Sequence, residues 1–143
     1  MNYISWALLG MLGYSATTLF VKFASREGRF SSFVILSIAV TIVVSSVLII
    51  TALRGDFKSL NAQTVKSTAM LWSIATGIVL AIAVISLFRA LSLGPASVVV
   101  PVYGMFIVGG AVLGMIFLHE PVTLNKIIGI LLAVVGIYFI TKK

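Results

Sequence analysis

The sequence predicts an all-α integral membrane protein with five transmembrane helices. Hydrophobic residues make up 61% of the 143-residue chain and charged residues only 9%, whereas a soluble domain carries roughly 25% charged residues. A chain of this composition has too few polar side chains to cover a surface that faces water. The apolar residues form five continuous runs. This pattern favours helices over a β-barrel, whose strands alternate between apolar and polar residues.

Each of the five runs is close to the length of about 20 residues that a helix needs to cross a bilayer. We expect a single membrane domain over residues 1–143, with helices at residues 4–23, 33–53, 69–88, 96–118 and 124–140. No small-residue cleavage pattern follows the first run in a polar segment. We therefore expect this run to be retained as a helix and not removed as a signal peptide.

The first run has one small and polar face on an otherwise apolar helix. The residues of this face recur at helical spacing and are Trp6, Gly10, Gly13 and Thr17, with Tyr14 beside them. Two interpretations are open: close helix packing through the glycines, or the wall of a substrate cavity that offers aromatic rings and hydroxyls. Lys22, near the end of the run, either extends to the lipid headgroups or attracts an anionic group of a substrate.

Hydroxyl residues mark the second run, in which Ser37, Thr41 and Ser45 follow one another at the spacing of a helix face. Hydroxyls in membrane helices usually bond to their own backbone or to a neighbouring helix. The alternative for Thr41 is a place at the edge of a substrate cavity.

The third run is preceded by the longest polar segment, residues 54–67, which has room for a short amphipathic turn at the membrane surface. Within the run, Trp72 fits either an aromatic belt at the interface or the substrate cavity. Arg89 lies where the headgroups are expected to begin, so we interpret it as an anchor.

The fourth run, which contains a proline and several glycines, has two halves of different character. Pro101 and Tyr103 make its first half the candidate cavity wall. Its second half is a candidate packing surface, because small residues let helix backbones approach closely. The small residues of the last two runs are Gly110 and Gly114 in GxxxG spacing, and Gly129, Ala133 and Gly136 on one face.

The chemistry of the side chains argues against an enzyme. The chain has no Cys and one His, which excludes a thiolate site and a multi-His metal site within one chain. Its acidic residues are Glu27, Asp56 and Glu120, all in loops or at the ends of the predicted helices. We expect no catalytic residues, no metal and no cofactor. We also expect no nucleic-acid partner, because the basic residues lie between and beside the apolar runs, where they set membrane topology.

Five spans place the two termini on opposite sides of the membrane, and the loop charges set the orientation only weakly. The side with more basic residues is expected to be cytoplasmic. Six basic residues fall on the side of the C-terminus, namely Lys22, Arg26, Arg29, Arg89, Lys142 and Lys143. Four fall on the other side, namely Arg54, Lys58, Lys66 and Lys126. A near-balance of this kind is typical of a chain that inserts in both orientations.

Three motifs in the last two-fifths of the chain resemble one protein family. They are Arg89-Ala-Leu-Ser-Leu-Gly-Pro-Ala-Ser, then Leu118-His119-Glu120-Pro121, then Lys126-Ile-Ile-Gly129-Ile-Leu-Leu-Ala-Val-Val-Gly136-Ile. Together they resemble the end of an EamA-type repeat of the drug/metabolite transporter superfamily. The first half of the chain is similar more loosely, through Trp6, Tyr14 and Lys22. The glycine register of the last helix also resembles the dimerisation helix of the small multidrug resistance proteins, and it maps to Gly129, Leu132 and Gly136.

The resemblance implies a partner copy. EamA proteins typically carry two five-helix repeats of opposite topology with the substrate between them, and this sequence contains one. A second copy in antiparallel orientation would supply the other half and would give an inverted repeat. The small multidrug family depends on a glutamate in its first helix, and this chain has Gly13-Tyr-Ser-Ala-Thr-Thr there. A neutral or zwitterionic metabolite therefore suits the chain better than a cationic drug.

We expect a small-molecule transporter that works by alternating access as an antiparallel homodimer in the inner or plasma membrane of a prokaryote. Its partners are membrane lipids, a small-molecule substrate and the second copy. The expected cavity residues are Trp6, Tyr14, Thr17, Lys22, Thr41, Trp72 and Tyr103. The expected dimer and packing residues are Gly110, Gly114, Gly129, Leu132, Ala133 and Gly136. The alternatives are a flippase for lipid-linked sugars and a non-transporting subunit of a larger membrane complex.

The weak charge asymmetry predicts dual topology. Because the chain has no cysteine, single cysteines placed at Ser25 and at Lys142 report cleanly on their side of the membrane. We expect a membrane-impermeant thiol reagent to label both positions partly in intact cells and fully after permeabilisation. Labelling that is complete or absent in intact cells would show one fixed orientation and would exclude the antiparallel arrangement.

Overall fold

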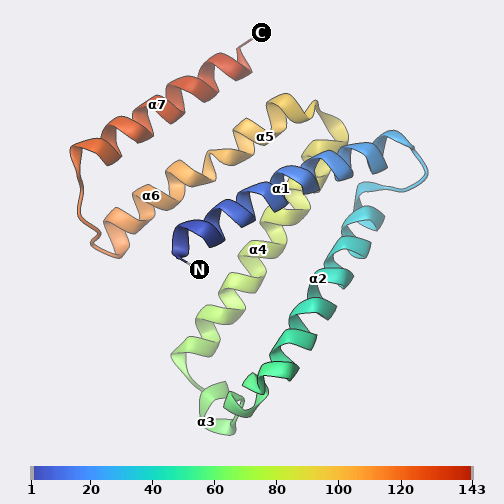
Figure 1. Ribbon diagram of the computed structural model, residues 1–143, viewed down its shortest axis with the longest axis vertical. Coiled ribbons are helices and arrows are strands. Elements are labelled where there is room, and N and C mark those ends of the chain that lie inside the picture. Colours follow the sequence, from blue (N-terminus) through green and yellow to red (C-terminus); the bar gives the residue numbers. More distant parts are fainter. Residues whose placement is uncertain (1, 143) are drawn as a thin grey trace. The chain divides into compact units, whose positions relative to one another are not determined.

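The computed structural model describes residues 2–142, and every regular element in this part of the chain is a helix (Figure 1). The elements are α1 (Tyr3–Arg26), α2 (Ser32–Arg54), the 3-10 helix η1 (Asp56–Ser59), α3 (Ala62–Val65), α4 (Thr68–Leu93), α5 (Ala96–Gly104), α6 (Phe106–Phe117) and α7 (Leu124–Thr141). Met1 and Lys143, the latter part of the charge count above, lie outside the described residues.

Five stretches are long and apolar enough to cross a membrane, which confirms the predicted fold class. They are Tyr3–Arg26, Ser32–Arg54, Thr68–Leu93, Ala96–Phe117 and Leu124–Thr141, and their lengths run from 18 to 26 residues. At a rise of about 1.5 Å per residue, each spans most or all of a hydrocarbon core of about 30 Å. The protein is therefore a multi-pass membrane protein.

The helices extend beyond the apolar runs, because charged residues continue them by one or more turns. Arg26 and Arg54 lie in the last turns of α1 and α2, where a cation interacts favourably with the negative end of the helix dipole. The third span runs on to Leu93, so Arg89 lies inside α4 instead of at its end. The polar segment after α2 holds the two short turns η1 and α3.

The fourth span is interrupted at Met105, whereas the sequence predicts one continuous helix over residues 96–118. The backbone N–H of Met105 bonds to the carbonyl of Val102, which is a three-residue spacing, before α6 resumes the four-residue pattern. Pro101 lies one turn earlier in α5. Its ring has no N–H to donate to the preceding turn, and Gly104 adds a residue of low helix propensity. Pro101 and Gly104 together explain why the helix tightens to a three-residue hydrogen bond at Met105.

Side chains and one glycine set the helix ends. The hydroxyls of Ser31 and Thr123 accept bonds from the backbone N–H groups of Val34 and Lys126, which begins α2 and α7. Gly55 ends α2 in the left-handed conformation, with φ of 72°, and its N–H bonds back to the carbonyls of Ala52 and Thr51.

The chain divides into two compact units, one made of residues 20–92 and the other of residues up to 19 together with those from 93 onward. In the first unit a small core joins the end of α1, the start of α2 and the end of α4. Its buried apolar residues are Val21, Leu36, Leu87, Phe88 and Leu91. In the second unit, α7 lies alongside α5 and α6 (Figure 1). Most other large apolar side chains are exposed, as expected where the surroundings are lipid tails.

The left-handed cap predicts opposite effects for two Gly-to-Ala changes. Gly55→Ala forces a Cβ into a left-handed conformation, so we expect a loss of about 1 kcal/mol of stability. Gly77 lies inside α4 with no atom within 4 Å of the position of an added Cβ. Gly77→Ala should therefore stabilise the chain by roughly 0.5–1 kcal/mol. Thermal unfolding in detergent measures both, and shifts of equal sign would contradict the cap assignment.

Candidate functional site

Two of the expected cavity residues are brought together within one unit. Tyr14 of α1 and Tyr103 of α5 are far apart in the sequence, and their phenol groups lie close enough to interact through their hydroxyls. The Tyr103 ring also meets Phe106 edge to face, with 5.7 Å between the ring centroids and 62° between the planes. The pair combines apolar rings with two polar atoms, which is the combination that amphipathic ligands require.

Trp6 and Thr17 lie on the same helix as Tyr14. The indole of Trp6 is 61% exposed, so it is available to a ligand or to a second chain. The hydroxyl of Thr17 donates to the carbonyl of Gly13 at 2.9 Å. Its lone pairs are still able to accept a hydrogen bond.

The other expected cavity residues, Lys22, Thr41 and Trp72, belong to the unit of residues 20–92. Thr41 donates its hydroxyl proton to the carbonyl of Ser37 at 2.8 Å, which is the common use of a hydroxyl in a membrane helix. The side chain of Trp72 is 70% exposed. Trp72 therefore fits an aromatic belt at the interface as well as a ligand contact.

Lys22 has a structural contact that the sequence did not reveal. Its Nζ donates to the carbonyl oxygen of Leu91 at 2.9 Å, and Leu91 itself is fully buried. Leu91 lies in the last turn of α4, where carbonyls have no partner inside the helix and the helix dipole is negative. The ammonium group thus caps α4 and ties it to α1. Gly94 and Pro95, which follow α4, are the sequence signal for a helix end there.

Ser32 is another polar residue of this core, and nothing in the sequence points to it. It is the first residue of α2 and is 6% exposed, and its Oγ has no hydrogen-bond partner among the described residues. A buried hydroxyl without a partner costs about 1–3 kcal/mol. The cost marks this end of α2 as a place where a water molecule or a polar group would be stabilising.

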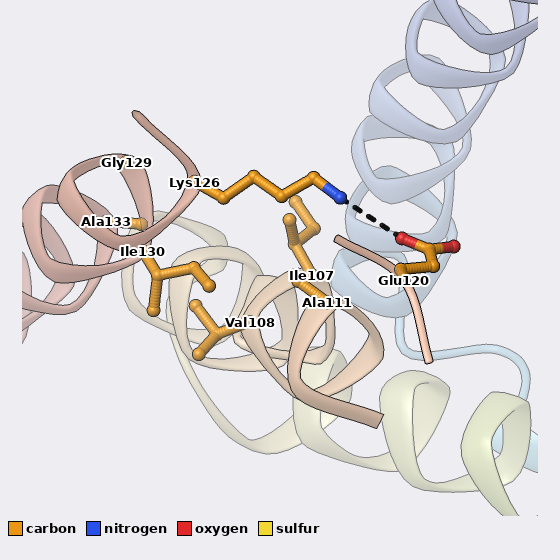
Figure 2. A pocket seen from close by; sticks show the side chains of 8 residues that line it. All are labelled: Ile107, Val108, Ala111, Glu120, Lys126, Gly129, Ile130 and Ala133. Carbon is orange, nitrogen blue, oxygen red and sulfur yellow. Dashed lines mark hydrogen bonds and ion pairs between the residues drawn. The ribbon is translucent and has the colours of Figure 1, made fainter. Parts of the chain in front are cut away.

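A hollow of about 240 Å³ lies between α6 and α7 (Figure 2). Its lining is Ile107, Val108 and Ala111 from α6, Glu120 from the connecting loop, and Lys126, Gly129, Ile130 and Ala133 from α7. The absence of large side chains at Gly129 and Ala133 creates the space. Two of the residues expected to pack a dimer therefore face a hollow within one chain.

An ion pair closes one end of this hollow. Lys126 Nζ lies 3.3 Å from Glu120 Oε2, and it also donates to the carbonyl of Pro121 at 3.1 Å (Figure 2). The carboxylate packs over Gly114, where an added Cβ would lie 3.5 Å from it. The loop turns at His119, which adopts a left-handed conformation with φ of 52°. A spacing of six residues across a loop predicts no contact, so the sequence alone does not reveal Lys126 as the partner of Glu120.

The remaining expected packing residues, Gly110, Leu132 and Gly136, are not covered by other parts of the described chain. Gly110 and Gly136 have no atom within 4 Å of the position of an added Cβ. Leu132 is 66% exposed on α7. At about 100° per residue, Leu132 and Gly136 lie on one side of Gly129, and Ile130 lies on the other. The expected dimer face and the hollow therefore occupy neighbouring sectors of α7 that share Gly129 and Ala133.

The comparisons with known proteins give one match. The family described as EamA-like transporter family matches residues 1–142. Neither the curated proteins nor the solved structures contain a match to the chain. No group of three or more His, Asp or Glu residues within the described range is placed to hold a metal ion.

The Lys22 contact predicts a loss of stability on removal of the ammonium group. Lys22→Met should reduce the free energy of unfolding by about 1 kcal/mol, because the last carbonyls of α4 lose a cationic partner. Lys58→Met, in the exposed turn η1, is the matched control and should change stability by less than about 0.5 kcal/mol. Thermal unfolding in detergent is the measurement, and equal effects of the two changes would show that the Leu91 contact contributes nothing.

Proposed function

Since the chain belongs to the EamA-like transporter family, and is thus a membrane transporter of the drug/metabolite superfamily, we propose that it moves a small amphipathic metabolite by alternating access. The working unit is an antiparallel homodimer in the cell membrane of a prokaryote. The observation that carries the proposal is the proximity of Tyr14 to Tyr103 inside two membrane spans.

The odd number of spans supports the proposal of a homodimer. A five-span chain and an inverted copy of it together form an inverted repeat, which is the architecture that places a substrate site at the middle of many transporters. The exposed apolar residues of the single chain support association with a partner. The partner face that we propose on α7 consists of Gly129, Leu132, Ala133 and Gly136, and α6 contributes Gly110 and Gly114.

The substrate class follows from the polar groups that the spans carry. Glu27, Asp56 and Glu120 all lie outside the five spans. A carboxylate that carries protons or binds a cationic drug would be expected within a span. Trp6, Tyr14, Thr17, Thr41, Trp72 and Tyr103 offer rings and hydroxyls instead. These groups suit a neutral or zwitterionic molecule, and Lys22 would attract an anionic group if the substrate has one.

The substrate class can be tested on purified protein. Ligands that bind the folded state raise its apparent stability, so a thermal-shift screen of metabolites and of polyprenyl-linked sugars separates the metabolite transporter from the lipid flippase. Uptake of the best ligand into liposomes then completes the test. Protein that binds neither class and moves nothing, but purifies with a larger complex, would be a non-transporting subunit.

Tyr103 provides the sharpest mutational test. Tyr103→Ala should lower the transport rate by at least about tenfold, since it removes a ring and the hydroxyl that meets Tyr14. The fraction of dimer should not change, because Tyr103 lies outside the proposed partner face. Tyr138→Ala is the matched control, because Tyr138 is an exposed tyrosine on α7. If Tyr103→Ala reduced the fraction of dimer while each remaining dimer still transported normally, the proposed roles of the two halves of the fourth span would be the wrong way round.

A further inference from the structure

The hollow between α6 and α7 is a candidate binding site outside the proposed substrate cavity. Its volume of about 240 Å³ lies below the range of about 300–1,000 Å³ that is usual for pockets that enclose a drug-sized ligand. A site of this size suits part of a larger molecule whose remainder lies outside the protein.

The position of the hollow in the membrane indicates what that molecule is. The ion pair joins Glu120 of the loop between the fourth and fifth spans to Lys126 in the first turn of α7, so it lies where the lipid headgroups are expected. From Lys126 to Ala133 the lining follows α7 for about 10 Å toward the bilayer centre. The lining along this path is apolar, with Ile107, Val108 and Ile130 as its largest members. A charged end at the surface and an apolar interior match the two parts of a phospholipid.

The charges at the end of the hollow match a zwitterionic headgroup. Lys126 and Glu120 together are neutral, and their side chains are 42% and 51% exposed, respectively. Lys126 presents N–H donors to a phosphate, and Glu120 presents a carboxylate to an ammonium group. The ammonium group of ethanolamine has N–H donors for the carboxylate, whereas the quaternary nitrogen of choline carries methyl groups and no N–H.

A helix of a second copy fits this place less well. It would bury two half-exposed charges and would have to compensate their desolvation, whereas a headgroup supplies opposite charges for both. We therefore propose that the groove between α6 and α7 binds one phosphatidylethanolamine molecule, with an acyl chain in the hollow and the headgroup across Lys126 and Glu120. The hollow and the dimer face on α7 proposed above share Gly129 and Ala133, so this lipid would form part of the dimer interface.

The test measures lipid retained by the full-length protein. The purified chain is reconstituted in vesicles of equal parts phosphatidylethanolamine, phosphatidylcholine and phosphatidylglycerol with identical acyl chains. It is then extracted in detergent, and the lipid that stays bound is counted by native mass spectrometry. We expect about one phosphatidylethanolamine per chain and a preference of about threefold or more over phosphatidylcholine, as exposed charge contacts allow.

Two variants test the two parts of the site separately. Glu120→Gln removes the partner of the ammonium group and should abolish the preference for phosphatidylethanolamine while retention of phosphatidylcholine stays unchanged. Ala133→Leu fills the hollow and should lower retention of all three lipids about fivefold or more. The matched control for added volume is Ala75→Leu, on the exposed surface of α4, which should retain lipid as the unchanged chain does.

Three results would overturn the proposal. The first is equal retention of the three lipids by all variants and the unchanged chain. The second is an Ala133→Leu variant that loses its dimer but keeps its lipid, because the hollow would then hold a second copy. The third is protection of the protein against heat by soluble phosphoethanolamine as strongly as by the whole lipid, because the acyl chain would then contribute nothing. Each readout is independent of transport, so failure here leaves the proposed function standing.

Discussion

The hydrocarbon interior of a membrane offers no hydrogen-bond partner, and most features of this chain follow from that constraint. Backbone groups in the spans must bond within their own helix, which excludes loops from the membrane depth. The hydroxyls obey the same constraint: those of Ser15, Thr17, Ser37, Thr41 and Thr76 donate to carbonyls four residues earlier in their own helices. Each helix thus satisfies most of its hydrogen-bonding groups within itself, and few side chains form hydrogen bonds between helices.

Two lysine contacts of the described chain show what does join the helices. Lys22 donates to a carbonyl at the end of α4, and Lys126 pairs with Glu120 in the loop before α7. In both, a lysine near a span end satisfies groups that the neighbouring helix or loop cannot satisfy by itself. The ammonium group is therefore used here to hold connections in place, which a count of charges for topology does not reveal.

The sequence was sufficient for the spans and insufficient for the contacts between them. The five spans could be predicted because composition alone decides whether a stretch of about 20 residues crosses a bilayer. Pro101 and Gly104 were visible, yet the interruption at Met105 depended on how the backbone absorbs a missing bond. The approach of Tyr14 to Tyr103 and of Lys22 to Leu91 joins residues about 70 or more positions apart, and no local pattern encodes such pairs. Gly129 and Ala133 were recognised as small, but their spacing did not say whether α6, lipid or a second copy lies against them.

The near absence of a buried core has a consequence for how this gene can vary. Five apolar side chains are buried in the described chain, whereas most of the others are exposed, and a lipid tail beside them would accept one aliphatic group as readily as another. Substitutions among Leu, Ile, Val and Phe at these positions should therefore change the stability of the protein little and be close to selectively neutral. Purifying selection then has few targets: the glycines, the hydroxyls, the aromatic residues of the proposed cavity and the handful of charges at the span ends. Two descendants of one ancestor can in this way lose most of their identity while they keep the same five spans.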